Sequence, residues 1–246
     1  PAQAAELQRR VVALGRRAIL FPLLEIQPLA DQEALRQALH TLDTYALIAF
    51  VSPNAIDAAF AARPDWPRQV PLAVVGEGSR QALQRHGVRP ESTRIFCPVD
   101  PDHSDSEGLL QALDLAALRG KPVLIVRGET GRELLADALR NAGAQVSTLA
   151  AYRRVPPAFD EQRRRELAGL LRSQNDWLVT SSEALRILLD MVVRLNEAEG
   201  VAKMQQQRII VPHMRIAETA RTLGFVNIVQ SRSGDDGLIA ALQSCS

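Results

Sequence analysis

Tyr152-Arg153-Arg154 is the segment whose residue types best suit proton transfer. The chain has two tyrosines, and this one stands beside two arginines. Neighbouring cations favour the phenolate form and make a phenol hydroxyl a better proton donor. Packing of the ring alone is an open alternative, and Tyr45, at the start of an apolar stretch, is expected to be structural. Tyr152 is therefore the candidate catalytic residue.

Small polar residues, glycines and arginines follow several apolar stretches, where helices are expected to begin. In open parallel sheets, ligands bind beyond the carboxyl ends of the strands. Free N–H groups at helix starts favour anions, so several such positions would suit a ligand with many carboxylates. Helix capping is an alternative role for each serine. The candidate substrate-binding residues are Ser52, Asn54, Gly78, Ser79, Arg127, Gly128, Ser181, Ser182 and Arg215.

Other chemistries are disfavoured by incomplete motifs. Gly76-x-Gly78 resembles a dinucleotide turn, but Gln81 stands at the third glycine position. The segment Arg127–Gly131 lacks the Gly-Lys-Ser/Thr of a phosphate loop, which argues against nucleotide hydrolysis. The run Asp100–Asp105 fits a solvated loop ending in a helix cap better than a metal site. We expect no metal and no cofactor.

Apolar runs alternate with helical patterns along the chain, and this order predicts an α/β fold with parallel sheets. The expected strands are Ala18–Leu24, Tyr45–Val51, Pro71–Val75, Arg94–Cys97, Pro122–Val126, Gln145–Ala151, Asp176–Thr180, Arg208–Val211 and Val226–Gln230. The expected helices are Gln3–Leu14, Asp31–Leu42, Pro53–Ala62, Ser79–His86, Ser106–Leu118, Gly131–Ala142, Asp160–Arg172, Ser182–Leu195, Arg215–Leu223 and Asp235–Leu242.

The sequence is internally duplicated. In each copy a predicted helix is ended by a glycine and followed by an extended segment that contains proline. The matching positions are Leu7, Gly15 and Pro28 in the first copy and Leu135, Gly143 and Pro156 in the second. Two further pairs follow in the same order. They are Phe50–Ala55 with Val179–Ala184, and Val74–Gly87 with Ile210–Gly224.

Two proline-containing exits predict that the chain crosses twice between two similar lobes. One lobe is then discontinuous, residues 1–26 and 154–246, and the other is the insertion 27–153. We expect a parallel sheet flanked by helices in each lobe, a two-stranded connector and an active-site cleft between the lobes. The second copy begins with a strand, Lys121–Arg127, that the first lacks, so we also expect a strand before Pro1.

Composition restricts the partners. The formal net charge is +1, so no overall field recruits nucleic acid. No apolar run approaches the roughly 20 residues that span a bilayer, and we expect no membrane partner. Cys97 and Cys245 belong to no CxxC pair, which suits unpaired thiols in a reducing cytoplasm. We expect a monomer.

Together the motifs resemble the uroporphyrinogen-III synthase family, in the family's order and over nearly the whole chain. The matching segments are Phe50–Ala55, Val74–Ser79, Leu124–Glu133, Leu149–Arg154, Leu178–Ala184 and Val211–Glu218. One departure is Pro212-His213, where many members have a glycine-containing turn, and it affects the matching of Met214 and Arg215.

The resemblance implies a cofactor-free, cyclising hydro-lyase of tetrapyrrole and haem biosynthesis. Its substrate would be hydroxymethylbilane, closed to uroporphyrinogen III with inversion of ring D and loss of water. Tyr152 would act on the leaving hydroxyl, and Ser79 would take the family's small-hydroxyl position. Ser52, Ser181 and Ser182 would contact substrate at the helix starts, and Arg127 and Arg215 would pair with carboxylates.

Two other classes of protein stay open. A bilobed sensor or binding domain without catalysis would use the same fold, because function depends on the site. A phosphosugar or nucleotide enzyme would need a phosphate loop, and the sequence contains none that we recognise.

Overall fold

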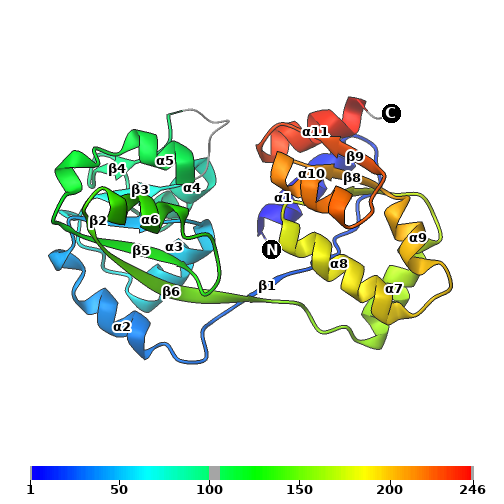
Figure 1. Ribbon diagram of the computed structural model, residues 1–246, viewed down its shortest axis with the longest axis horizontal. Helices are drawn as coiled ribbons and strands as arrows, with labels where there is room; N and C mark the ends of the chain where they lie inside the picture. Colours follow the sequence, from blue (N-terminus) through cyan, green and yellow to red (C-terminus); the bar gives the residue numbers. More distant parts are fainter. Residues whose placement is uncertain (1, 100–105, 245–246) are drawn as a thin grey trace. The chain divides into compact units, whose positions relative to one another are not determined.

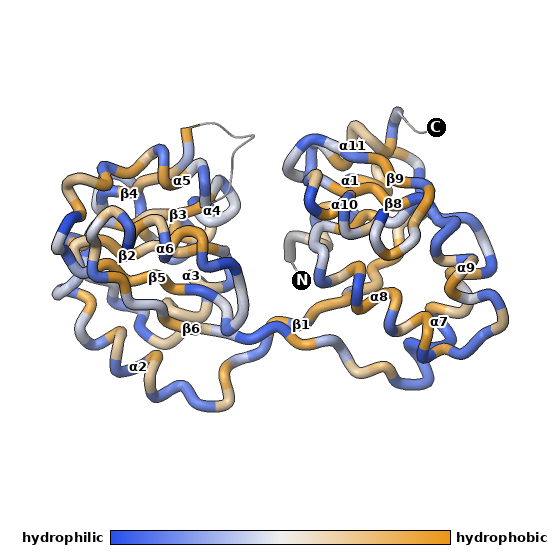
Figure 2. Tube along the Cα trace, viewed as in Figure 1, coloured by the Kyte–Doolittle hydropathy of each residue, from blue (hydrophilic) through white to orange (hydrophobic). Residues whose placement is uncertain are grey.

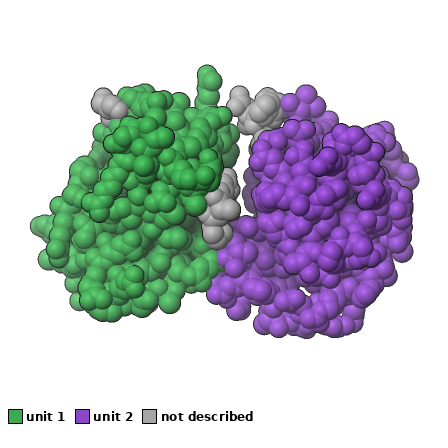
Figure 3. Space-filling view, turned by 180° about the vertical axis from the view of Figure 1, so that it is seen from behind, with its two compact units in different colours: residues 1–25, 156–246 green, residues 26–155 purple. Residues whose placement is uncertain are grey.

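The structure is a computed structural model that describes residues 2–99 and 106–244. Pro1, the run Asp100–Asp105 and Cys245 lie outside the described residues. The chain divides into two compact units (Figure 3), unit 1 with residues 1–25 and 156–246, and unit 2 with residues 26–155. The sequence predicts junctions after residues 26 and 153, and the structure places them after 25 and 155.

Unit 2 is a sheet with helices on both faces (Figure 1). Its strands are β1 (Glu25–Gln27), β2 (Leu47–Phe50), β3 (Leu72–Val74), β4 (Ile95–Phe96), β5 (Pro122–Gly128) and β6 (Gln145–Val155). Its helices are α2 (Glu33–His40), α3 (Pro53–Ala62), α4 (Glu77–Arg85), α5 (Ser106–Ala112) and α6 (Leu134–Asn141), with 3-10 turns at Leu42–Thr44 and Ala116–Leu118.

The strand order of the described sheet is β1-β6-β5-β2-β3-β4. Strand β2 lies in the middle and is buried on both faces, which explains its continuous apolar run. Ile48 and Phe50 pack under α2, α3 and α4, whereas Leu47 and Ala49 pack under α5 and α6. The parallel pairing brings the carboxyl ends of β2, β3, β5 and β6 to one edge.

The larger sheet is mixed, so the prediction of a wholly parallel sheet is wrong here. The pairs among β2 to β6 are parallel, and the exception is the edge strand β1 beside β6. The physical reason is connectivity. The chain enters unit 2 through β1 and leaves it through the end of β6. These two strands are neighbours in the sheet and therefore run in opposite directions.

Unit 1 is a smaller α/β unit. Its strands are β7 (Asp176–Leu178), β8 (Arg208–Val211) and β9 (Asn227–Gln230), which pair in parallel in that order. Its helices are α1 (Ala2–Ala13), α7 (Glu161–Leu171), α8 (Ser182–Leu195), α9 (Gly200–Gln205), α10 (Met214–Thr222) and α11 (Gly234–Ser244).

The sheet of unit 1 is also packed with apolar residues on both faces. Ile209 and Val211 pack with α7 to α10, and Ile210 packs with α1 and α11. Figure 2 shows the apolar residues of β2, β5 and β8 inside their units. No helix within the described ranges has the length and apolar character that crossing a bilayer requires.

The predicted strand Ala18–Leu24 is wrong. These residues form no strand, and the first strand of the described chain is β1. A strand needs a neighbour for its backbone N–H and C=O groups. In the described part of unit 1, β7 is an edge of the sheet with no strand beyond it. The segment is instead held by side chains, with Leu23 buried in the α7–α10 core.

The duplicated positions adopt the same local structure in both units. Gly15 and Gly143 follow helices with φ of 76° and 92°, and Gly87 and Gly224 do so with φ of 77° and 85°. This left-handed region favours glycine after a helix. The matching motifs also start helices in the same way, as described below for Ser52 and Ser181.

Candidate functional site

Ser52 begins the site at the carboxyl end of β2. It is the N-cap of α3, and its Oγ accepts a hydrogen bond from the Ala55 N–H at 3.2 Å. Pro53 occupies the first helical position, where its missing N–H costs nothing. Asn54 follows, half-buried, in the same first turn. The local sequence thus fixes the Ser52 hydroxyl at the sheet edge.

Tyr152 meets Ser52 from β6. The Tyr152 hydroxyl lies 3.1 Å from Ser52 Oγ, and the residue is 6% exposed. On its other side the ring lies against Gly128, where an added Cβ would be 3.0 Å from Tyr152 Cζ and 3.2 Å from Oη. The phenol is therefore held between the end of β5 and the start of α3.

A shift in strand register aims Tyr152 at this position. Arg127 pairs with Ala150, but the next residue, Gly128, pairs with Tyr152, so Ala151 is the extra residue. Side chains alternate along a regular strand, yet Ala151 and Tyr152 both belong to the core cluster on the α3 face. The irregularity turns Tyr152 onto that face.

The loop between β5 and α6 is fixed at two points. Arg127, with a side chain 10% exposed, pairs through Nη1 with Glu133 Oε1 at 2.5 Å. Arg154 Nη2 donates to the Thr130 carbonyl at 3.2 Å and to Thr130 Oγ1 at 3.3 Å. Gly128 lies between these contacts, so they also hold the glycine against Tyr152.

Helix α4 adds Gly78 and Ser79 to the same edge. An added Cβ at Gly78 would lie 3.8 Å from Pro53 Cγ, which places the first turn of α4 beside the start of α3. Ser79 is buried, and its N–H donates to the Gly76 carbonyl at 3.1 Å. Unit 2 thus brings together seven predicted residues: Ser52, Asn54, Gly78, Ser79, Arg127, Gly128 and Tyr152.

Unit 1 carries the other three predicted residues at the corresponding edge of its own sheet. Ser181 caps α8, and its Oγ accepts from the Ala184 N–H at 3.0 Å. Ser182 is buried, and its hydroxyl accepts from Thr219 Oγ1 at 2.9 Å, which links α8 to α10. Arg215 is exposed in the first turn of α10.

The arginines beside Tyr152 have other contacts. Arg153 Nη2 donates to Gln27 Oε1 of β1 at 3.1 Å, and Arg154 binds Thr130. The pairing of Arg127 with Glu133 likewise occupies the guanidinium expected to bind a carboxylate. Sequence reasoning missed Thr130 and Glu133. Their spacing resembles a capping box, but Glu133 makes no side-chain cap and pairs with Arg127 instead.

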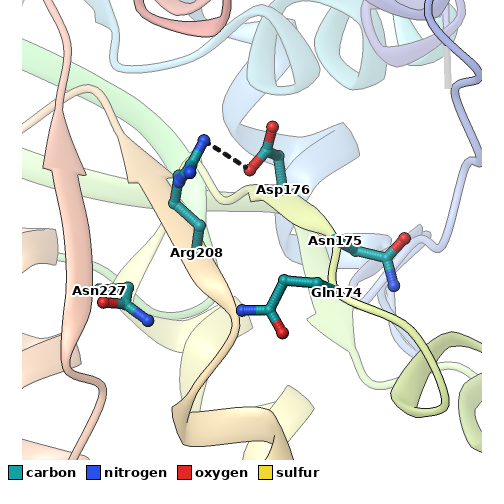
Figure 4. Close-up of a pocket in the computed structure, with 5 residues that line it drawn as sticks. All are labelled: Gln174, Asn175, Asp176, Arg208 and Asn227. Carbon is teal, nitrogen blue, oxygen red and sulfur yellow. Dashed lines mark ion pairs between the residues drawn. The ribbon is translucent and has the colours of Figure 1, made fainter. Parts of the chain in front are cut away.

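The hollow in Figure 4 lies at the opposite, amino-terminal edge of the unit 1 sheet. Asp176 pairs with Arg208 at 3.3 Å, and the amides of Gln174 and Asn227 both donate to the Gln206 carbonyl at 2.8 Å. These polar groups stabilise the strand starts, so the hollow is part of the framework of unit 1. Within residues 2–99 and 106–244, no cluster of His, Cys, Asp and Glu could hold a metal ion.

Cys97 lies near the start of α4 and offers a prediction about its thiol. Burial raises the pKa of the Cys97 thiol, Arg80 opposes the rise and Glu77 adds to it. Because the thiolate is the nucleophile, alkylation should require a higher pH than for free cysteine. In a Cys245→Ser variant, we expect the pH midpoint of iodoacetamide labelling of Cys97 to be higher in the folded protein than in the same protein unfolded in urea. An equal or lower midpoint would contradict the burial described here.

The fold and the site define an α/β protein of two compact units, with a buried tyrosine and capped helix starts at the carboxyl edges of its sheets. Residues 5–240 match the family model described as uroporphyrinogen-III synthase HemD. The chain belongs to the uroporphyrinogen-III synthase family. Membership confirms the resemblance and the function expected from it, that of a uroporphyrinogen-III synthase of tetrapyrrole biosynthesis.

Relatives agree with this membership, and solved structures share the fold. The chain is 32% identical to the uroporphyrinogen-III synthase of Salmonella typhimurium, over 99% of this chain and 97% of the relative. It is also 32% identical to that of Escherichia coli K12, over 97% and 95%. The fold is similar to uroporphyrinogen-III synthetase from Helicobacter pylori, with TM-score 0.66, 13% identity and coverage of 94% and 96%. A mutant synthase from Thermus thermophilus gives TM-score 0.60, 16% identity and coverage of 100% and 94%.

Proposed function

We propose that the protein converts hydroxymethylbilane into uroporphyrinogen III, with inversion of ring D and loss of water. The family membership supports the reaction. The observation that carries the proposal within the chain is the Tyr152 hydroxyl, held 3.1 Å from the capping serine Ser52 at the carboxyl edge of the sheet. That edge is where ligands of open α/β sheets bind.

The first step needs a proton donor. As the C–O bond to the hydroxymethyl carbon breaks, Tyr152 donates its proton to the departing oxygen, water leaves and a delocalised cation remains. The substituted carbon of ring D then attacks the cationic carbon to give a spiro intermediate. Its rearrangement and closure at the unsubstituted carbon of ring D give the inverted ring, and the proton lost from that carbon balances the proton that Tyr152 donated. The protein mainly holds the chain curled, orients ring D and assists the departure of water.

The substrate carboxylates call for donors around the reacting end. In our proposal, the N–H groups at the starts of α3, α4, α8 and α10 supply them, with Asn54, Gly78, Ser79, Ser181, Ser182 and Arg215 at those positions. Gly128 has no side chain, so in our proposal it lets the substrate come close to the backbone. Arg127 is buried against Glu133, so a role in binding a carboxylate would require it to exchange that partner.

An assay on the purified protein tests the proposal. Hydroxymethylbilane closes without an enzyme to the isomer that keeps ring D uninverted, so the ratio of isomers separates catalysis from binding. We expect isomer III to dominate when protein is present, in proportion to protein concentration. Isomer I alone, at the uncatalysed rate, would show a binding domain without this activity. The cleft between lobes, the cytoplasmic location and the monomeric state stay predictions.

A further inference from the structure

We infer that Ser52 is a positioning residue, which donates its hydroxyl proton to the Tyr152 oxygen and leaves the Tyr152 proton free for the substrate. The inference rests on the proposed function, because it concerns how Tyr152 presents its proton. It assigns to Ser52 a role beyond the expected contact with substrate. Two features of the local structure and one chemical argument support it.

The first is the hydrogen-bonding capacity of Ser52. A serine hydroxyl has one donor and two acceptor positions. The Ala55 N–H uses one acceptor position at 3.2 Å, and the Tyr152 hydroxyl lies 3.1 Å away on a further position. Ser52 can therefore keep its cap and still donate its own proton to Tyr152.

The second is a chemical argument about the direction of this bond, because the geometry allows either hydroxyl to be the donor. If Tyr152 donated to Ser52, its proton would be directed at the cap and could not reach a substrate. If Ser52 donates, the Tyr152 proton can point to the leaving hydroxyl. After that proton has moved, the phenolate oxygen keeps the bond from Ser52, and hydrogen bonds to an ionised acceptor are the stronger kind. The bond thus becomes stronger as the reaction proceeds, which is the condition for lowering a barrier.

The third is the rigidity of both partners. Ser52 is fixed by the cap and by Pro53, and the Tyr152 ring is fixed by Gly128 and the surrounding core. Ser181 makes an equivalent cap in unit 1 at 3.0 Å. Helix capping alone is enough to explain a serine at Ser52 and at Ser181. Ser52 differs because its hydroxyl also contacts the Tyr152 phenol.

A double-mutant cycle separates this role from the others. Ser52→Gly removes the hydroxyl, and glycine is almost as good as serine at an N-cap. We expect kcat to fall about tenfold with KM little changed, the factor for one lost hydrogen bond. Ser52→Thr, which keeps the hydroxyl, should restore kcat. In a Tyr152→Phe background, Ser52→Gly should lower kcat by less than about a further twofold. The two effects should not add, because the two residues act together.

Two further measurements separate the loss of the Ser52 hydroxyl from a loss of structure as the cause of the lower kcat. Asp160→Ala removes a cap of the same kind from α7, where Asp160 Oδ1 accepts from the Arg163 N–H at 2.8 Å, and it should leave kcat unchanged. With 13Cζ-labelled tyrosine, the two resonances belong to Tyr45 and Tyr152. Ser52→Gly should move the Tyr152 resonance and leave that of Tyr45 in place.

The outcomes distinguish the inference from the proposed function. If Ser52→Gly keeps full kcat while Tyr152→Phe is impaired, the role of Ser52 is overturned and that of Tyr152 stands. An equal loss from Ser52→Gly in both backgrounds would mean that Ser52 acts on the substrate independently, and it would overturn the inference as well. Full activity of Tyr152→Phe would remove the proposed role of Tyr152 and the inference with it.

Discussion

Replacement of Tyr152 by Phe should lower the rate of isomer III formation about 10²–10⁴-fold at saturating substrate, the usual contribution of one general acid. The substitution removes the hydroxyl and keeps the ring, so the contacts with Gly128 and the core remain. The spontaneous closure to isomer I does not need the enzyme and should continue. Rates and isomer ratios are read together by separating the products at several protein concentrations.

The matched control is Tyr45→Phe. Tyr45 is half-buried beside the same core cluster, and its substitution should leave the rate unchanged. Both variants should unfold at nearly the wild-type denaturant concentration, because each loses one hydroxyl. Wild-type turnover of Tyr152→Phe would mean that the tyrosine contributes packing alone.

Replacement of Gly128 by Ala should lower the rate about 10- to 100-fold without unfolding the protein. The new methyl carbon would lie 3.0 Å from Tyr152 Cζ and 3.2 Å from Tyr152 Oη, closer than ordinary contacts allow. Since the ring is buried, it must shift by a few tenths of an ångström and strain its contact with Ser52. A small displacement of a group that takes part in the reaction can lower the rate strongly. Steady-state kinetics and the Tyr152 13Cζ resonance measure both effects.

Gly169→Ala is the control for this change. Gly169 lies within α7, and an added Cβ there would meet no atom within 4 Å. Alanine in a helix interior stabilises by about 0.5–1 kcal/mol relative to glycine, so this variant should be as active as the wild type and slightly more stable. If Gly128→Ala kept both the wild-type rate and the wild-type resonance, the packing of Tyr152 on Gly128 would be contradicted.

Features set by neighbouring residues were predictable from the sequence, and features set by distant pairing were not. Ser52-Pro53 predicts the start of α3 and Ser181-Ser182 that of α8, because a cap and its helix are adjacent in the chain. The apolar segment Ala18–Leu24 has the composition of a strand, but strand formation depends on a partner that composition does not specify.

The same distinction applies within the site. Tyr152 is a candidate from its type and from its neighbours, and its catalytic role stays a prediction. The register shift at Gly128 that turns it toward Ser52 depends on how β5 and β6 pair, and no local pattern announces it. Glu133 was missed because its partner Arg127 suggested a ligand contact, and the ion pair is visible only when the loop is folded.

The interrupted order of unit 1 has a consequence for synthesis on the ribosome. Residues 1–25 belong with residues 156–246, so about 130 residues of unit 2 are made between the two parts of unit 1. At roughly 5–20 residues per second, the first part waits on the order of ten seconds for its partners. During that time Val11 and Leu23 lack the later helices of unit 1 that cover them in the folded protein. Unit 2 is synthesised completely before the second part of unit 1, so we expect it to fold before residues 1–25 can pack in their own unit.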